Sequence, residues 1–354
     1  MSAFDELTAA EDPSLSEEEH MFLEVVARIA DAEVEPHAAM IDRSGELPDQ
    51  LVSLLDEQDL AVVAAPEALG GAGARTVLAV LTVERLAEAS AAVGWRVGVR
   101  QAALAAISAS GRHGTLASPP PALIDGAAYA WVDKNGLIAG EIPRAVGIDE
   151  DTMLVILAKA DSGREVALLC GAGTGSIGPR SKRCGLRGVT TAALALDGVV
   201  SDAILGEAAA RAARRHRDLI LGACSVGVAR RAVTLSGAYL RERRQFGRPL
   251  SHFGALRRML SDCAARVAAA SSLLHAAAVR PAGSPESALQ AARVSSEAAV
   301  AVADDAIQVH GGYGYVQEYV PERLLRDAIT LRALAGAHAH AASAEALVGG
   351  GQLD

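Results

Sequence analysis

Two stretches in the C-terminal half of the chain decide its fold. Residues 241–250 read Arg241-Glu242-Arg243-Arg244-Gln245-Phe246-Gly247-Arg248-Pro249-Leu250, and residues 308–315 read Gln308-Val309-His310-Gly311-Gly312-Tyr313-Gly314-Tyr315. Between them, apolar residues recur at helical spacing, so long helices are expected to join the two stretches. Each stretch therefore indicates a turn at a helix end.

The side chains of these two turns suit a phosphate-bearing ligand. Arg243 near a helix end can give paired hydrogen bonds to a pyrophosphate, and Phe246 can cover an adenosine with its ring. Gln308 can bond polar ligand atoms, while Gly311 and Gly312 let backbone amides approach a phosphate without a Cβ in the way. The alternative without a ligand is a basic helix end and a glycine cap. Both turns in one chain favour the nucleotide interpretation.

This pair of turns resembles the C-terminal helical domain of the acyl-CoA dehydrogenase family, whose R-x-x-F-G and Q-x-x-G-G turns bind the ADP half of FAD. In the family's tetramers these groups reach the FAD of the neighbouring subunit, so the resemblance implies an oligomer as well as FAD. Phe253 stands in the family's H-F-Q element, but Gly254 replaces its glutamine, which predicts weaker nucleotide binding. The resemblance assigns to FAD binding Arg243, Gln245, Phe246, Leu250, Phe253, Gln308, Gly311 and Gly312.

The predicted fold is mostly α. A hydrophobic share of 51% with only 3% aromatic residues, much of it alanine, favours closely packed helices. The order of a helix, a P-E-x-x-G-G turn starting at Pro66 and a helix pair also resembles the family's N-terminal domain. We expect an N-terminal helical domain over residues 1–122, a small trimmed middle β domain over 123–207 and a C-terminal four-helix bundle over 208–354.

The individual elements follow from periodicity and turn residues. A capping box at Ser16 starts the first helix, and Glu35-Pro36 is expected to stop it. Asn135-Gly136 predicts a hairpin turn. Further helices are predicted over residues 48–59, 76–92, 95–110, 211–242, 255–279, 284–309 and 321–347, and strands over 128–132, 153–158, 166–170 and 192–196.

The middle domain departs from the family pattern. Family members that hold flavin carry a T-E-P-x-A-G-S-D loop and a W-I-T-N-G loop, whose hydroxyl and backbone groups meet the isoalloxazine ring. Neither string occurs here, and the region from residue 127 to 176 is too short for both. We therefore predict that this subunit does not build a complete flavin-ring pocket by itself.

The catalytic base of the family is also missing. The family places a glutamate eight residues after the aspartate of its R-D-A signature or near the start of the first C-terminal helix, and these positions hold Ala335 and Arg217. Asp218 is one residue from the second position, a rotation of about 100° on a helix. The remaining proton acceptors nearby are His310, His338 and His340, although a single helical histidine is more often structural. We predict no catalytic residue in this chain.

Charge and composition exclude several classes of function. A net charge of -10 and a pI near 5.4 argue against nucleic-acid binding. The four cysteines lack metal-site or disulfide spacing, and His338 and His340 are two residues apart, so no metal is expected. The polar N-terminus predicts that there is no signal peptide, and the lack of an apolar run of about 20 residues predicts that there is no membrane span. We therefore expect a cytoplasmic location. Arg326-Asp327 is expected to form a structural ion pair.

Together these features resemble the shortened partner subunits of heterotetrameric acyl-CoA dehydrogenases of actinobacterial steroid side-chain β-oxidation. The expected role is to complete the FAD site of a longer acyl-CoA dehydrogenase subunit that acts on an acyl-CoA substrate, with an electron-transfer flavoprotein as a candidate acceptor. One alternative is a self-sufficient dehydrogenase that uses Asp218 or a histidine as its base. Another is a scaffold protein without a cofactor.

Overall fold

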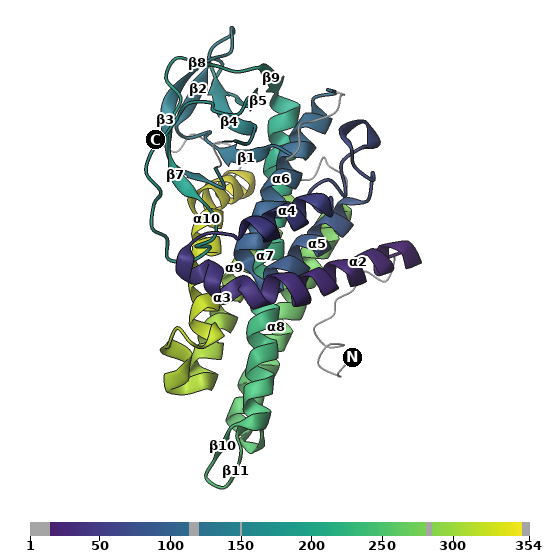
Figure 1. Ribbon diagram of the computed structural model, residues 1–354, viewed down its shortest axis with the longest axis vertical. Coiled ribbons are helices and arrows are strands. Elements are labelled where there is room, and N and C mark those ends of the chain that lie inside the picture. Colours follow the sequence, from purple (N-terminus) through teal and green to yellow (C-terminus); the bar gives the residue numbers. More distant parts are fainter. Residues whose placement is uncertain (1–14, 113–119, 149–150, 281–284, 349–354) are drawn as a thin grey trace.

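The computed structural model describes residues 15–112, 120–148, 151–280 and 285–348. Within these ranges the chain is mostly helical, with one β-sheet at one end of the elongated molecule and long helices running to the other end (Figure 1). The mostly α fold class predicted from the sequence is confirmed. Elements change from helix to strand between Ala109 and Ala122 and return to helix at Glu207. The division into three domains at these positions stays a prediction.

The N-terminal helices begin as the sequence predicts but continue further. Ser16 Oγ accepts the backbone N–H of Glu19, and the Glu19 carboxylate accepts that of Ser16 at 2.8 Å, which completes the capping box. The predicted stop at Glu35-Pro36 is wrong. A π-helical turn over Ala30–Val34 lets the N–H of Glu35 bond to the carbonyl of Ala30, and Pro36 then lies in the first turn of α3, where a missing N–H is tolerated. The elements are α2 (Glu17–Ile29), α3 (Glu35–Ser44), α4 (Asp49–Glu57), α5 (Thr76–Ala89) and α6 (Ala91–Ala109).

The part of the chain between α6 and the first C-terminal helix forms one sheet. Its strand order is β6-β7-β3-β2-β4-β5-β9, with β1 beside β4 and β8 beside β3. The predicted hairpin at Asn135-Gly136 is confirmed, because β2 and β3 pair antiparallel and Gly136 has φ +82°. Strand β1 was not predicted, since its four residues show no alternation and pair in parallel with β4. The strands are β1 (Ala122–Asp125), β2 (Ala130–Val132), β3 (Leu137–Val146), β4 (Leu154–Ala160), β5 (Glu165–Cys170), β6 (Ser176–Ile177), β7 (Thr191–Ala195), β8 (Val199–Val200) and β9 (Ala203–Gly206).

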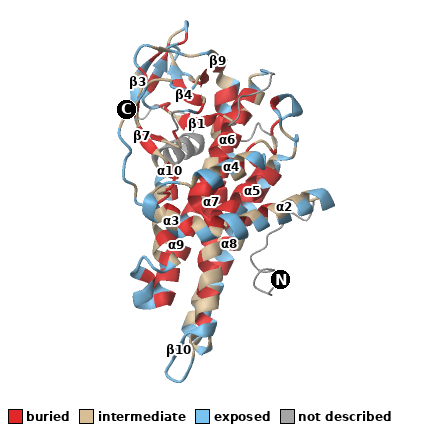
Figure 2. Ribbon diagram, in the orientation of Figure 1, coloured by how far each residue is buried: buried red, intermediate tan, exposed pale blue. Residues whose placement is uncertain are grey.

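Four long helices form the C-terminal part, as predicted. They are α7 (Glu207–Glu242), α8 (Gly254–Val279), α9 (Pro285–His310) and α10 (Val320–Val348), the last kinked at Gly336. By length and composition α7 could cross a membrane, but 78% of its most apolar window is buried inside the fold. Figure 2 shows this burial along α5, α6 and α7. Helix α7 is therefore the core around which the other helices pack.

Small residues allow these helices to approach closely. A Cβ on Gly98 of α6 would lie 2.1 Å from a side-chain carbon of Ile220 on α7. A Cβ on Gly227 of α7 would lie 2.5 Å from the carbonyl oxygen of Glu84 on α5. Because such contacts are too short for any side chain, glycine is required at both helix crossings. The alanine-rich composition thus corresponds to close packing of helices, as the sequence indicated.

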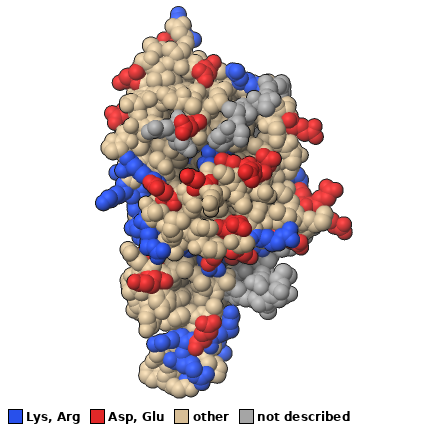
Figure 3. Space-filling model, in the orientation of Figure 1, with Lys and Arg blue, Asp and Glu red and all other residues tan. Residues whose placement is uncertain are grey.

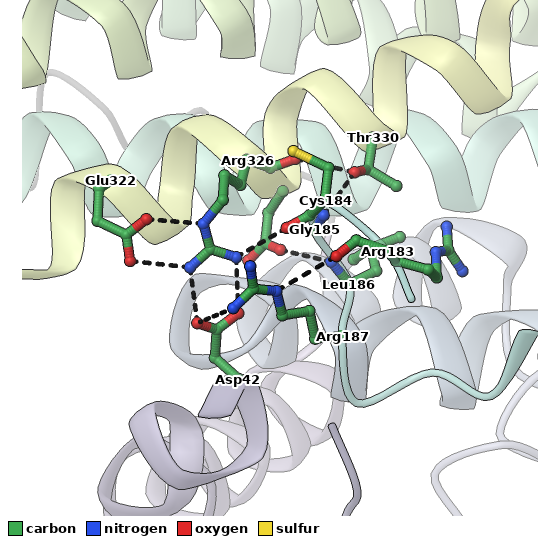
Figure 4. Close-up of polar contacts among 10 residues, drawn as sticks. Asp42, Arg183, Cys184, Gly185, Leu186, Arg187, Glu322, Arg326 and Thr330 are labelled. Carbon is green, nitrogen blue, oxygen red and sulfur yellow. Dashed lines mark hydrogen bonds and ion pairs between the residues drawn. The ribbon is translucent and has the colours of Figure 1, made fainter. Parts of the chain in front are cut away.

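Arg326 and Asp327 tie α10 to distant segments, and Figure 4 shows the contacts of Arg326. The guanidinium of Arg326 forms ion pairs with Asp42 of α3 at 2.6 Å and with Glu322 at 2.7 Å. The Asp327 carboxylate accepts the backbone N–H of Leu186 at 2.6 Å. Burial raises the pKa of Asp327 to about 6, although this N–H bond opposes the shift. Both residues thus have a structural role, but Arg326 forms its ion pairs with Asp42 and Glu322 and not with Asp327, and together the two residues join α3, the loop before β7 and α10.

We predict that Arg326→Met lowers the free energy of unfolding by about 3 kcal/mol, because the largely buried Glu322 loses its counter-charge and Asp42 keeps only Arg187, at 3.7 Å. The matched control on the same helix is Arg332→Met, which removes only an exposed pair with Glu297 and costs less than about 1 kcal/mol. Urea unfolding of both variants and the wild type measures the difference. Equal destabilisation by the two substitutions contradicts the assignment.

Candidate functional site

The first predicted turn is a two-residue hairpin at the tip of the molecule (Figure 1). It follows α7 directly, with β10 (Arg244–Gln245) paired antiparallel to β11 (Arg248–Pro249). Phe246 and Gly247, the two turn residues, both have positive φ, at +52° and +79°. This geometry is typical of a type I′ turn, in which a phenylalanine is strained. Phe246 is 91% exposed, so this strained turn presents an apolar ring to solvent.

The second predicted turn ends α9. The chain continues from His310 into a short 3₁₀ helix over Gly311–Tyr315, and Gly311 has φ +60°. A Cβ on Gly311 or on Gly312 would meet no atom within 4 Å. Both glycines therefore leave open space beside the backbone, as a close approach of ligand to backbone requires.

The two turns meet at one cavity of about 640 Å³. Six of the eight residues predicted to bind the nucleotide line it: Arg243, Gln245, Leu250, Gln308, Gly311 and Gly312. Phe246 and Phe253 do not line it, and their rings form an edge contact with centroids 6.2 Å apart. The structure thus brings together polar and backbone groups from both turns and places the two phenylalanines beside them.

Aromatic side chains that the sequence analysis did not assign complete the walls of this nucleotide cavity. Tyr313 lies beneath the guanidinium of Arg243, 5.5 Å from its ring centroid. Tyr239 stacks on His310 with ring centroids 4.2 Å apart. His310 also bonds through Nδ1 to the carbonyl of Ala306, and burial lowers its pKa, so it is a wall residue rather than a base. The position of Tyr239, four residues before Arg243 on the same helix face, is the signal that could have identified it.

The charge around the nucleotide cavity is positive although the whole protein is acidic. Between residues 241 and 258 the sequence has six arginines and one glutamate. Figure 3 shows Lys and Arg side chains gathered over the hairpin end of the molecule. Such a local basic field favours phosphate groups. The donor set, the open glycines and the aromatic walls fit the ADP half of FAD.

Arg217 and Ala335, the two positions that the resemblance assigns to the catalytic base, lie close together. Arg217 on α7 donates through Nη2 to the carbonyl of Leu334 at 2.8 Å, directly before Ala335. Ala335 is buried, and the kink at Gly336 follows it. Arg217 and Ala335, which the sequence assigned separately, therefore lie in the same region, and their side chains there are a guanidinium and a methyl group.

The nearby carboxylates are held by arginines. Asp218 accepts a hydrogen bond from Arg217 at 3.2 Å and is 4% exposed. Asp125 of β1 pairs with Arg214 at 2.5 Å and lies 3.6 Å from Arg217. Burial raises the pKa of Asp218 to about 6, against the opposing effect of Arg217 and Arg214. The side chains of His338 and His340 are not among those that the structure describes. Among the described residues, no cluster of His, Cys, Asp or Glu could hold a metal.

Comparison with known proteins identifies the fold. The profiles for the N-terminal and C-terminal domains of acyl-CoA dehydrogenase match residues 16–126 and 202–343. The probable acyl-CoA dehydrogenase YngJ of Bacillus subtilis is 30% identical, with 89% of this chain and 93% of that protein covered. This chain belongs to the acyl-CoA dehydrogenase family. The family consists of FAD-dependent oxidoreductases that act on a CH–CH bond.

Two further comparisons agree with this assignment. The probable acyl-CoA dehydrogenase fadE25 of Mycobacterium leprae is 29% identical, with 88% of this chain and 90% of that protein covered. A glutaryl-CoA dehydrogenase from Mycobacterium smegmatis, solved in complex with FADH2, superposes with a TM-score of 0.84 at 18% identity and full coverage of both chains. The second comparison establishes the fold alone.

We predict that Arg243→Met weakens the binding of ADP roughly 10- to 100-fold, because a charge-assisted hydrogen bond to the pyrophosphate is lost. Arg258→Met is the matched control, since that side chain is 85% exposed and does not line the nucleotide cavity. Isothermal titration calorimetry with ADP measures both variants against the wild type. The same affinity for all three proteins contradicts the proposed contact.

A second prediction concerns the buried Asp218. Its folded pKa of about 6 lies above the unfolded value of 3.8, so the folded state binds more protons between these limits. The contribution of Asp218 therefore makes the free energy of unfolding rise as the pH falls from about 6 to about 4, by at most ~1.4 kcal/mol per pH unit. Urea unfolding across this range compares the wild type with Asp218→Asn. If the variant has the same pH slope as the wild type, Asp218 is not the titrating group.

Proposed function

We propose that this chain is a subunit of an acyl-CoA dehydrogenase complex that helps to bind FAD and supplies no catalytic base. The observation that carries the proposal is the contact between Arg217 and the carbonyl of Leu334, next to Ala335, because neither Arg217 nor Ala335 is a carboxylate. The substrate class proposed is an acyl-CoA thioester. FAD, when bound, supplies the acceptor for the hydride that leaves the β carbon.

The residues at the base positions cannot remove an α-proton. A guanidinium stays protonated in proteins and has no acceptor site, and an alanine has no polar group. Arg217 is also fixed by the carbonyl of Leu334, by Asp218 and by Asp125. In the proposed complex the carboxylate that abstracts the α-proton therefore comes from another chain.

The nucleotide cavity gives this chain its part in the complex. Arg243 and the backbone amides of Gly311 and Gly312 would hold the pyrophosphate, while Gln308 would bond polar atoms of the cofactor. Phe246 stands beside the cavity at 91% exposure, so a neighbouring subunit is expected to cover it. We propose a longer acyl-CoA dehydrogenase subunit as that neighbour, in a heterotetramer, with an electron-transfer flavoprotein as a candidate electron acceptor.

The location proposed is the cytoplasm. All four cysteines are unpaired, which fits a reducing compartment. Three of them are buried, whereas Cys184 is exposed. Its position in the loop held by Arg326 explains the exposure, because that loop crosses the surface of α10.

A self-sufficient dehydrogenase that uses Asp218 is the second candidate. Asp218 is the carboxylate closest in sequence to a vacated base position, and its raised pKa is a property of many general bases. Its burial at 4% exposure and its bond to Arg217 oppose this role, because a substrate would have to displace the arginine. A scaffold without cofactor is disfavoured by the lined nucleotide cavity.

Expression alone and together with a longer acyl-CoA dehydrogenase subunit tests the proposal. We expect the isolated chain to retain little flavin and the co-purified complex to absorb near 450 nm, at about the wavelength of bound FAD. Native mass and flavin content of the complex give the stoichiometry. A yellow homo-oligomer of this chain that oxidises acyl-CoA would overturn the proposal and favour the Asp218 alternative, which Asp218→Asn then tests directly.

A further inference from the structure

A second cavity lies on the opposite face of α7 from the vacated base positions. Successive helical residues turn by about 100°, so Ala212, Arg215 and His216 share one face and Arg214 and Arg217 point the other way. The first three residues line a cavity of about 240 Å³, together with residues of α6 and of the segment that follows α4. This α6/α7 cavity is therefore separate from the nucleotide cavity, with which it shares no lining residue.

Arg215 is a buried cation without a carboxylate partner among the described residues. It is 6% exposed, and its Nη2 donates to the carbonyls of Ala277 and Arg280 at the end of α8, at 3.1 and 2.8 Å. Its Nε–H has no acceptor. Burial lowers its pKa, and no acidic side chain offsets this effect. A buried guanidinium is costly unless a negative group lies beside it.

Two further polar side chains at the α6/α7 cavity lack a partner. Nε2 of His216 and Oε1 of Gln101 are buried and form no hydrogen bond. Gln101 is oriented by its Nε2, which donates to the carbonyl of Leu60 at 3.1 Å, so Oε1 remains as an acceptor. Burial lowers the pKa of His216 to about 4, and Arg215 adds to the shift, so the imidazole is neutral near pH 7. Unpaired buried groups of this kind each cost roughly 1–3 kcal/mol.

The rest of the wall defines what could satisfy these groups. The lining residues described for this cavity include no aspartate or glutamate, and apolar atoms of Ala61, Ala65 and Leu104 make up much of the surface. Arg215 and His216 can donate to an anionic oxygen, whereas Oε1 of Gln101 requires a donor. A ligand with a carboxylate, a hydroxyl group and a short apolar body matches all three requirements.

We propose that the α6/α7 cavity binds a small hydroxycarboxylic acid, with its carboxylate on Arg215 and His216 and its hydroxyl group on Gln101. Because Arg215 also holds the end of α8, the bound acid stabilises the junction of α6, α7 and α8. This site is independent of the nucleotide cavity and of the proposed role in the complex.

Calorimetric titration of the full chain with three compounds of similar size tests the proposal. We expect saturable binding of 3-hydroxybutyrate in roughly the millimolar range. Butyrate, which lacks the hydroxyl group, is expected to bind about tenfold more weakly, and 1,3-butanediol, which lacks the carboxylate, should show no saturable binding. Equal affinity for either analogue, or no binding of 3-hydroxybutyrate, overturns the proposal.

Two variants locate the site. Arg215→Met should abolish 3-hydroxybutyrate binding, whereas Arg211→Met, one helical turn earlier and 68% exposed, should leave it unchanged. Ala105→Leu provides a check that keeps every charged group, because its larger side chain enters the cavity from α6 and should also prevent binding. Circular dichroism confirms folding of each variant. Undiminished binding in Ala105→Leu or Arg215→Met places the acid elsewhere and refutes the assignment.

Discussion

Three arginines near the start of α7 hold the rest of the molecule in place. Arg214 binds carboxylates of the sheet, at Asp125 and Glu165. Arg215 binds carbonyls at the end of α8, and Arg217 binds a carbonyl of α10. Because these residues point to different sides of one helix, α7 fixes the sheet, α8 and α10 relative to each other. A shift of one residue would turn α7 by about 100° and break these contacts, so they fix the rotation of α7 about its axis.

This constraint explains how the chain can keep the family fold with Arg217 and Ala335 at the two positions that the resemblance assigns to the base. In the place of a carboxylate, Arg217 adds a positive charge that is balanced by Asp125 and Asp218. The contact with α10 is a hydrogen bond to a backbone carbonyl, so it does not depend on the side chain of Ala335. A structural link between α7 and α10 thus occupies the position that the resemblance assigns to the catalytic base.

The long helices and the nucleotide turns could be predicted because their signals are local. Predicted helical limits such as 255–279 agree with the observed Gly254–Val279 within one residue, and Arg243 and Gly312 lie in one cavity as expected. The continuation past Pro36 could not be predicted, because it depends on a π-helical turn that no residue type specifies. The spacing of Tyr239 from Arg243 could have placed it on the same helix face, but its stacking on His310 required knowledge of which helix faces α9.

The cluster at Arg215 shows a different limit of sequence analysis. Arg214, Arg215 and Arg217 read alike as basic residues in a helix, and only the packing of α6 and α8 separates a paired guanidinium from one without a counter-charge. Phe246 and Phe253 show the same limit: they lie beside the nucleotide cavity and not in its lining, and their contact with a nucleotide stays a prediction.

The exposed ring of Phe246 also bears on how newly made chains are handled in the cell. The strained hairpin presents this aromatic side chain to water at the end of an elongated molecule. Such an exposed apolar group favours non-specific association until another surface covers it. In the proposed heterotetramer the partner subunit would cover this ring, so chains made in excess of that subunit would be the preferred targets of chaperones and proteases. Balanced synthesis with the proposed partner would then be a condition for this chain to accumulate.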